Sequence, residues 1–176
     1  MYRNLSLLLF PLIVLVGCNM PMAQIKVSVA GGERLTANMP HGNIQGEQET
    51  EVQIVMATFL TDPAQKHGRY VFAADVKIAT PLKSVRVEEV SGSKADVLID
   101  DKDPKLMGKM NLWHGDSENM TYDNPRLFWL HDIDETFLVY RFIFTFADGK
   151  VVRLHHVAYF IPMVKAHVRK ELGQTE

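Results

Sequence analysis

From residue 51 onward, apolar residues recur at every second position, the spacing that most restricts what this chain can fold into. Successive side chains of a strand point to opposite sides, so this period is typical of β-strands with one buried face. Turn-forming residues separate the alternating segments, and no long amphipathic helix precedes the C-terminus. The pattern predicts short antiparallel strands whose buried faces carry Val52, Ile54, Met56 and Leu60; then Tyr70, Phe72, Ala74, Val76 and Ile78; then Val85 and Val87, followed by a short strand at 96–99.

The last two predicted strands, 136–146 and 151–161, form the hairpin whose register the sequence predicts most clearly. A two-residue loop of Asp148 and Gly149 would pair Phe144 with Arg153 and mix apolar and charged residues on one face. A three-residue loop, 147–149, keeps one face apolar and places Gly149 at the left-handed position of a type I turn with a bulge. We therefore predict the three-residue loop, which pairs Phe144 with Val152, Phe142 with Leu154, Tyr140 with His156 and Leu138 with Ala158.

Together these strands predict an all-β fold, an antiparallel immunoglobulin-like or similar β-sandwich with a short C-terminal helix. The helix is expected after Pro162, where Val164, Val168 and Leu172 fall on one helical face. The Cys…Trp…Cys spacing of antibody domains is missing from this sequence, since Cys18 is its one cysteine.

The N-terminal apolar run from Leu5 to Val16 spans 12 residues and is interrupted by Ser6 and Pro11. A membrane-spanning helix needs about 20 apolar residues, so this run is too short to cross a bilayer. Its position after Arg3 and before small residues is typical of a cleavable signal peptide. The alternative is a buried N-terminal helix that happens to contain a cysteine.

The residues that end this run, Leu15-Val16-Gly17-Cys18, resemble the lipobox of bacterial lipoproteins, in which a small residue precedes the cysteine. The resemblance implies that the Cys18 thiol receives a diacylglycerol, that cleavage follows Gly17, and that the new amino group is acylated. Several acyl chains together give stable attachment, whereas one chain binds only marginally. It also implies the periplasmic face of the outer membrane, because Asn19 stands where an aspartate would favour the inner membrane.

Cleavage would divide the chain into a signal peptide at 1–17, a lipidated N-terminus and flexible tether at 18–50, and a β-sandwich domain at 51–176. Within the tether, the alternation at 25–29 predicts a first strand. Removing Arg3 with the signal peptide changes the formal net charge from −2 to −3. This acidic balance, with no basic stripe, argues against nucleic acid as a partner. We expect the membrane, through the lipid anchor, and another envelope protein as partners.

Met107, Met110, His114 and Met120 lie in one segment that we expect to be a loop. Thioether and imidazole ligands suit Cu(I), so this segment is a candidate copper site. The four residues lack compact spacing, and the alternative is that the methionines fill the open end of the sandwich.

Other candidate metal ligands are weaker. His155 and His156 are adjacent in a predicted strand and point to opposite faces, so they cannot bind one ion together. The acidic turns 100–104 and 132–135 could together hold calcium weakly, but they lack the glycine and the final glutamate of a calcium-binding EF-hand loop, so solvated turns are favoured. We therefore predict no metal and no cofactor.

Motifs that mark catalysis are missing from the sequence. It has no G-x-S-x-G, no H-E-x-x-H and no glycine-rich phosphate loop after a strand. The one thiol, on Cys18, is assigned to the lipid. We therefore expect a protein that is not an enzyme.

The second face of the final hairpin combines apolar residues with arginine, histidine and tyrosine, a composition typical of recognition surfaces. The alternative is that a loop, such as 101–125, covers this face. The sequence thus predicts a lipid-anchored, non-enzymatic binding or assembly module of the cell envelope; the alternative is a periplasmic copper or small-ligand carrier. The predicted partner-binding residues are Phe137, Arg141, Arg153, His155 and Tyr159.

Overall fold

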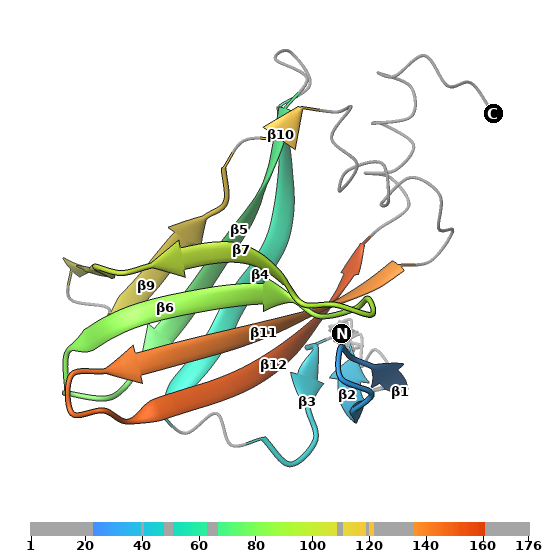
Figure 1. Cartoon of the computed structure of the whole chain (residues 1–176), viewed down its shortest axis with the longest axis horizontal. Coiled ribbons are helices and arrows are strands. Elements are labelled where there is room, and N and C mark those ends of the chain that lie inside the picture. Colours follow the sequence, from blue (N-terminus) through green and yellow to red (C-terminus); the bar gives the residue numbers. More distant parts are fainter. Residues whose placement is uncertain are drawn as a thin grey trace, which may run out of the picture.

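The computed structural model describes residues 23–39, 41–47, 51–62, 67–108, 111–118, 120–121 and 136–160. Within these residues the chain forms β-strands and no α-helix, which confirms the all-β prediction (Figure 1). Cys18 and the helix expected after Pro162 lie outside the described residues. The strands are β1 (Ala23–Ser28), β2 (Arg34–Met39), β3 (Asn43–Ile44), β4 (Val52–Asp62), β5 (His67–Val76), β6 (Leu82–Glu89), β7 (Asp96–Asp101), β8 (Leu106–Met107), β9 (Leu112–Asp116), β10 (Met120–Thr121), β11 (Thr136–Phe146) and β12 (Val151–Phe160).

The strands build two antiparallel sheets, and Figure 1 shows the larger one in front of the smaller. Sheet A has seven strands in the order β1-β2-β3-β12-β11-β6-β7. Sheet B has five strands. One edge of β5 pairs with β4 along its whole length, and the other edge pairs with β9 and then β10, while β8 pairs with β9. Three of the hairpins, β4–β5, β6–β7 and β11–β12, join strands that are neighbours in both sequence and space.

The main core lies between the two sheets and is rich in aromatic rings. Tyr140 and Phe142 of β11 and Phe72 of β5 are fully buried. The Phe72 ring meets Tyr140 edge-to-face with centroids 5.0 Å apart, and it meets Phe142 in the same way at 5.5 Å. Such pairs contribute about 0.5–1.5 kcal/mol each beyond the area they bury. The predicted inward faces of β5 and β11 are therefore confirmed.

Trp113 joins the sheets where β7 of sheet A approaches β9 of sheet B. Its indole Nε1 donates a hydrogen bond to Asp101 Oδ2 at 3.1 Å, and its ring packs edge-to-face on Phe144. A Cβ atom on Gly115 would lie 2.5 Å from the Trp113 ring, so only glycine leaves room for the indole at this position. The hydrogen bond satisfies the buried N–H while the rest of the ring fills the core.

The β11–β12 hairpin has the predicted register. Phe144 pairs with Val152, Phe142 with Leu154, Tyr140 with His156 and Leu138 with Ala158. In the turn, Gly149 has φ +87° and donates its N–H to the Phe146 carbonyl at 3.0 Å. The three-residue loop is therefore confirmed. It holds because this register buries one continuous apolar face.

Strand β4 departs from the predicted alternation. Its pairing with β5 shifts between Ile54, opposite Ala74, and Met56, opposite Ala73, so Val55 is an extra residue. A bulge of this kind reverses which side chains point inward. Val52 and Ile54 are buried as expected, but Met56 and Leu60 are 37% and 47% exposed, so that part of the prediction is wrong.

Two segments expected as loop or tether contain strands. The segment 101–125 includes β8, β9 and β10, and β9 pairs with β5 beside the main core. Residues 23–47, here called the N-terminal arm, form β1, β2 and β3 and extend sheet A beyond β12. The prediction of a flexible tether at 18–50 is therefore wrong for this arm, apart from its expected first strand. The turn-forming residues of the arm connect short strands. The later strands, β2 and β3, were not predicted because the segment is poor in aromatic residues.

A second apolar cluster holds the arm against the outer face of sheet A. It joins arm residues to side chains from β11, β12 and the end of β6, and it lies on the opposite side of the hairpin from the main core. Gly42 makes the close approach possible, because a Cβ there would lie 2.1 Å from the Val157 carbonyl oxygen. The buried members are Val29, Leu35, Ala37, Ile44, Val90, Val139 and Val157.

Candidate binding surface

The register places four of the five predicted partner-binding residues on one side of the β11–β12 hairpin. Phe137 pairs with Tyr159 and Arg141 pairs with His155, while Arg153 lies opposite Ile143. Phe137, Arg141, Arg153 and His155 therefore lie on the outer face of sheet A. The side chain of Tyr159 is outside the described part of the chain, and the other four residues are divided between two ends of this face.

One end of this face is covered. Val139 and Val157 are each 1% exposed, and Phe137 packs against the same cluster, beneath the N-terminal arm. We call Phe137, Val139 and Val157 the covered end. The predicted exposed apolar surface is wrong here, because these side chains complete a second core. The covering element is the arm, whereas the segment 101–125 contributes strands to sheet B.

His155 contacts the N-terminal arm and is not part of an exposed surface. Its backbone N–H donates to Glu47 Oε2 at 2.6 Å, and its Nδ1 lies 2.7 Å from Glu47 Oε1. The Glu47 carboxylate thus accepts the backbone hydrogen bond that a neighbouring strand would otherwise accept, at the point where β3 ends beside β12. Since His155 is only 8% exposed, its prediction as a partner-binding residue is not supported by its position.

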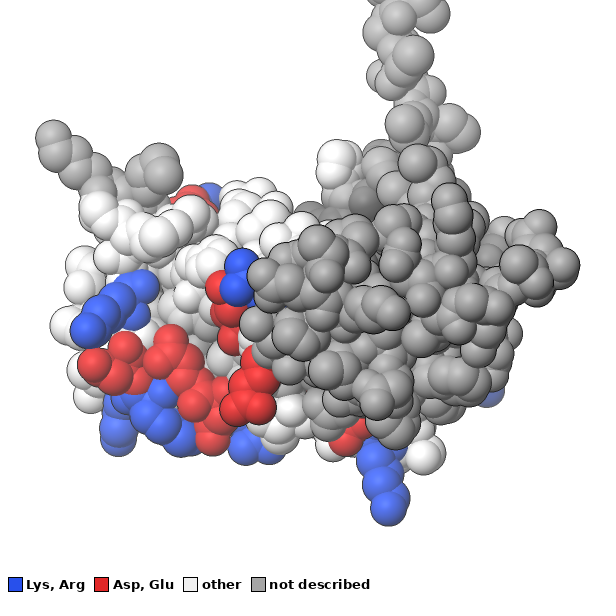
Figure 2. Space-filling view, turned by 90° about the horizontal axis from the view of Figure 1, so that it is seen from above, with Lys and Arg blue, Asp and Glu red and all other residues white. Residues whose placement is uncertain are grey.

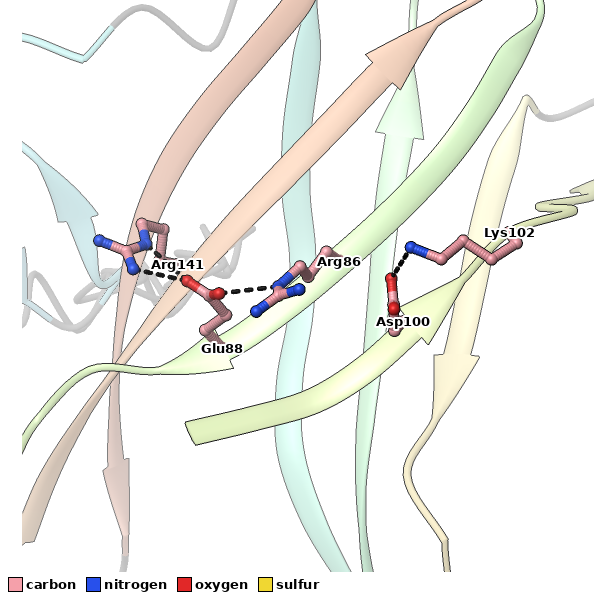
Figure 3. A network of polar contacts seen from close by, with 5 residues as sticks. All are labelled: Arg86, Glu88, Asp100, Lys102 and Arg141. Atoms are coloured by element: carbon pink, nitrogen blue, oxygen red, sulfur yellow. Dashed lines mark hydrogen bonds and ion pairs between the residues drawn. The ribbon is translucent and has the colours of Figure 1, made fainter. Parts of the chain in front are cut away.

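The other end of the face carries charge, and we call Arg141, Ile143 and Arg153 the charged end. Arg141 donates from Nε and Nη2 to Glu88 Oε2 at 2.8 and 2.6 Å. Arg86 donates from Nε to Glu88 Oε1 at 2.7 Å, so one carboxylate holds two guanidinium groups (Figure 3). Both interactions are charge-assisted hydrogen bonds, which are stronger than bonds between neutral groups.

Glu88 is the buried centre of this network, with 7% of its side chain exposed. Burial by itself raises the pKa of Glu88, but the hydrogen bonds and charges of Arg141 and Arg86 outweigh it and lower the pKa below its ordinary value. The carboxylate is therefore ionised at neutral pH and fixes both arginines. Neither Arg86 nor Glu88 was predicted from the sequence, because the contact between Glu88 and Arg141 becomes apparent only from the register between β6 and β11.

An exposed ion pair lies at the edge of the network. Asp100 of β7 pairs in register with Arg86, and its carboxylate accepts a hydrogen bond from Lys102 at 2.5 Å. Figure 2 shows basic and acidic side chains beside one another on the face it displays, with no broad area of a single sign.

The candidate copper residues are not all brought together. Met107 pairs with Leu112, two residues before His114, so Met107 and His114 are diagonal neighbours on one face of β8 and β9. His114 pairs in register with Ala73, whereas Met120 pairs with Gly68, five residues along β5 and hence on the order of 16 Å away. Met107 is 48% exposed. Met110 lies outside the described residues. Among the residues that are described, no three His, Cys, Asp or Glu side chains are grouped to hold a metal ion.

Two ionisable side chains lie opposite each other on the core side of the hairpin, Tyr140 fully buried and His156 half-buried. Tyr140 Oη and His156 Nδ1 are buried, and neither has a hydrogen-bond partner among the described residues. Burial lowers the pKa of His156 to about 4, and burial also raises the pKa of Tyr140 well above its ordinary value. Both groups are therefore neutral at pH 7 and act as packing side chains.

Comparison with known proteins adds no relative. No family model, no curated protein and no solved structure matches the chain. Across the described strands and turns, no helix has the length and hydropathy needed to span a bilayer.

Proposed function

We propose that this chain is a lipid-anchored β-sandwich of the cell envelope that binds or assembles another envelope protein without catalysing a reaction. The observation that carries the proposal is the charged end, where Glu88 holds two arginines on a rigid sheet next to half-buried Ile143. A fixed arginine pair beside apolar surface is a common feature of protein interfaces. The arm covers the other end, so the proposed contact is confined to this half of the hairpin.

The sandwich is proposed to be immunoglobulin-like. The order β4-β5-β9-β8 corresponds to strands A-B-E-D of that fold, and β12-β11-β6-β7 corresponds to G-F-C-C′. The large tryptophan departs from the antibody pattern, because Trp113 lies on the strand equivalent to E. The arm, β1 to β3, would then be an addition beside strand G.

The anchor is proposed from the sequence around Cys18. Lipidation there would attach the domain to the periplasmic face of the outer membrane, as the likeness to a lipobox implies. The described strands begin at Ala23, which would leave a short connection between Cys18 and the arm. A module held so close to the membrane would meet partners in or next to it.

Site-specific photocrosslinking in intact cells tests this proposal. A photoreactive residue at Ile143 should capture one discrete envelope protein, whereas the same residue at exposed Leu60 of sheet B should not. In the Cys18→Ala background, the protein should leave the membrane fraction and the Ile143 crosslink should weaken. Absence of a crosslink at Ile143, or equal capture at both positions, would contradict the proposed binding surface. Unchanged detergent-phase partitioning of Cys18→Ala would contradict the anchor.

A further inference from the structure

Three arginines surround Ile143 on the outer face of sheet A. Ile143 of β11 pairs with Arg86 of β6 on one side and with Arg153 of β12 on the other. Arg141 lies two residues from Ile143 on the same strand, so its side chain points to the same side. We call Arg86, Arg141 and Arg153 the arginine triangle. Arg86 and Arg153 lie two strand spacings apart, roughly 10 Å between their Cα atoms.

The triangle keeps hydrogen-bond donors available for a ligand. Arg86 contacts Glu88 through Nε, and 43% of its side chain is exposed. Arg141 contacts Glu88 through Nε and Nη2 and is 28% exposed. Arg153 is exposed and forms no ion pair with any described residue. Because each guanidinium has five N–H donors, several remain unused after Glu88 is satisfied.

Glu88 prepares this site for an anion without neutralising it. The triangle with Glu88 carries a formal charge of +2, within a chain whose net charge is −2. Since Glu88 already fixes Arg86 and Arg141, these two side chains would lose little further conformational freedom when a ligand binds them. A guanidinium matches the planar geometry of a carboxylate, which it can bind through two parallel hydrogen bonds.

We propose that the arginine triangle binds carboxylate side chains of an acidic, extended segment in a partner protein. This inference rests on the proposed binding function and names the chemistry of its partner. Side chains two residues apart on one face of a strand are about 7 Å apart, which suits arginines spread around Ile143. Ile143 offers apolar contact to the aliphatic stems of such residues. Asp100, beside Arg86, would repel a uniformly anionic lipid surface, whereas a peptide can place its carboxylates between the acidic groups.

Fluorescence anisotropy with the full-length chain in detergent tests the proposal. The probe is a labelled octapeptide of alternating Glu and Thr, and its control carries Gln in place of Glu. Arg153→Gln should weaken binding of the acidic probe about tenfold, since it removes a guanidinium that pairs with no described residue and leaves Glu88 undisturbed. Arg86→Gln should weaken it less. Rising salt should weaken binding, because these charges are partly exposed.

Arg69→Gln is the matched control. Arg69 lies on sheet B, its side chain is 44% exposed, and it pairs with Asp116 at 3.5 Å. The variant therefore removes the same charge from an exposed arginine on the other sheet, and it should leave probe affinity unchanged. Equal loss in Arg69→Gln and Arg153→Gln, or equal affinity for the Glu and Gln peptides, would overturn the proposal.

Vesicles containing phosphatidylglycerol distinguish a lipid from a peptide ligand. If they displace the acidic probe and bind less well to Arg153→Gln, the triangle recognises lipid headgroups and the peptide assignment is overturned. If crosslinking at Ile143 succeeds but the acidic probe does not bind, the proposed binding function stands and the acidic partner is wrong. If the probe binds as expected but crosslinking fails, the chemistry of the triangle stands and the proposed function loses its support.

Discussion

The covered end and the charged end of the β11–β12 hairpin occupy the same face of the same two strands, yet they have opposite surroundings. At the covered end, Val139 and Val157 are each 1% exposed beneath the N-terminal arm. At the charged end, Arg153 is exposed and Arg141 is held by Glu88. The main core lies under both ends. The difference is therefore set by what packs on the outer face, and the arm stops where Glu47 meets His155.

The apolar outer face of the hairpin is not exposed along its whole length. Strands buried on both sides carry apolar residues at successive positions, whereas strands with one wet face alternate. The run Phe137, Leu138 and Val139 is apolar throughout, and both of its faces are buried by different cores. Beyond Tyr140 the run Phe142, Ile143 and Phe144 is also apolar, yet Ile143 on the outer face is only half-buried, so the local pattern does not by itself decide which end is covered.

The largest difference between the two ends is expected for a buried charge. Val139→Asp would place a carboxylate without a partner in the second core and should lower the free energy of unfolding by about 4 kcal/mol or more. Ile143→Asp puts the same group on the same face of the same strand, at the charged end, and should cost under about 1 kcal/mol. Urea unfolding of both variants measures the difference. Similar losses would show that the two ends are equally buried.

Acid should destabilise the protein through His156, which lies on the core side of the β11–β12 hairpin. The unfolded chain protonates His156 below its ordinary pKa of about 6.5, whereas the folded chain leaves it neutral down to about 4. The unfolded state therefore binds more protons in this window, and stability falls as the pH is lowered from 6.5 to 4. The contribution is on the order of 3 kcal/mol.

Urea unfolding at a series of pH values measures this contribution. In His156→Asn, which has no titrating group at that position, stability should depend less on pH between 6.5 and 4. The two proteins should differ most in slope, whatever their stabilities at neutral pH. An unchanged slope would show that the folded state accepts the proton on His156 without cost.

A smaller effect is expected where the charged end meets Glu88. Glu88→Gln leaves two arginines without their shared carboxylate and should lower the free energy of unfolding by about 2 kcal/mol, less than for a fully buried pair, because both arginines are partly hydrated. Asp100→Asn breaks the neighbouring exposed pair with Lys102 and should cost under about 0.5 kcal/mol. Thermal unfolding at neutral pH compares them. Equal effects would mean that the network of Glu88 is no stronger than a surface pair.

The sequence alone determined the all-β fold, the inward faces of β5 and β11, and the register of the last hairpin. These features are local: alternation assigns each side chain to a face, and one register keeps Phe142 and Phe144 on an apolar side opposite Leu154 and Val152. Gly149 supports that register through its own backbone conformation. All of this information lies within the strands themselves and the turns that join them.

Only the tertiary structure decided what covers each face. The bulge at Val55, the pairing of β9 with β5, and the docking of the arm through Gly42 all depend on contacts between different segments of the chain. The arginine triangle has the same origin, because β6, β11 and β12 each contribute one arginine, and Glu88 joins two of them across strands. The alternating pattern determines which side of its strand a side chain points to. Whether it then meets water, a carboxylate or a second apolar layer depends on which distant segment folds against it.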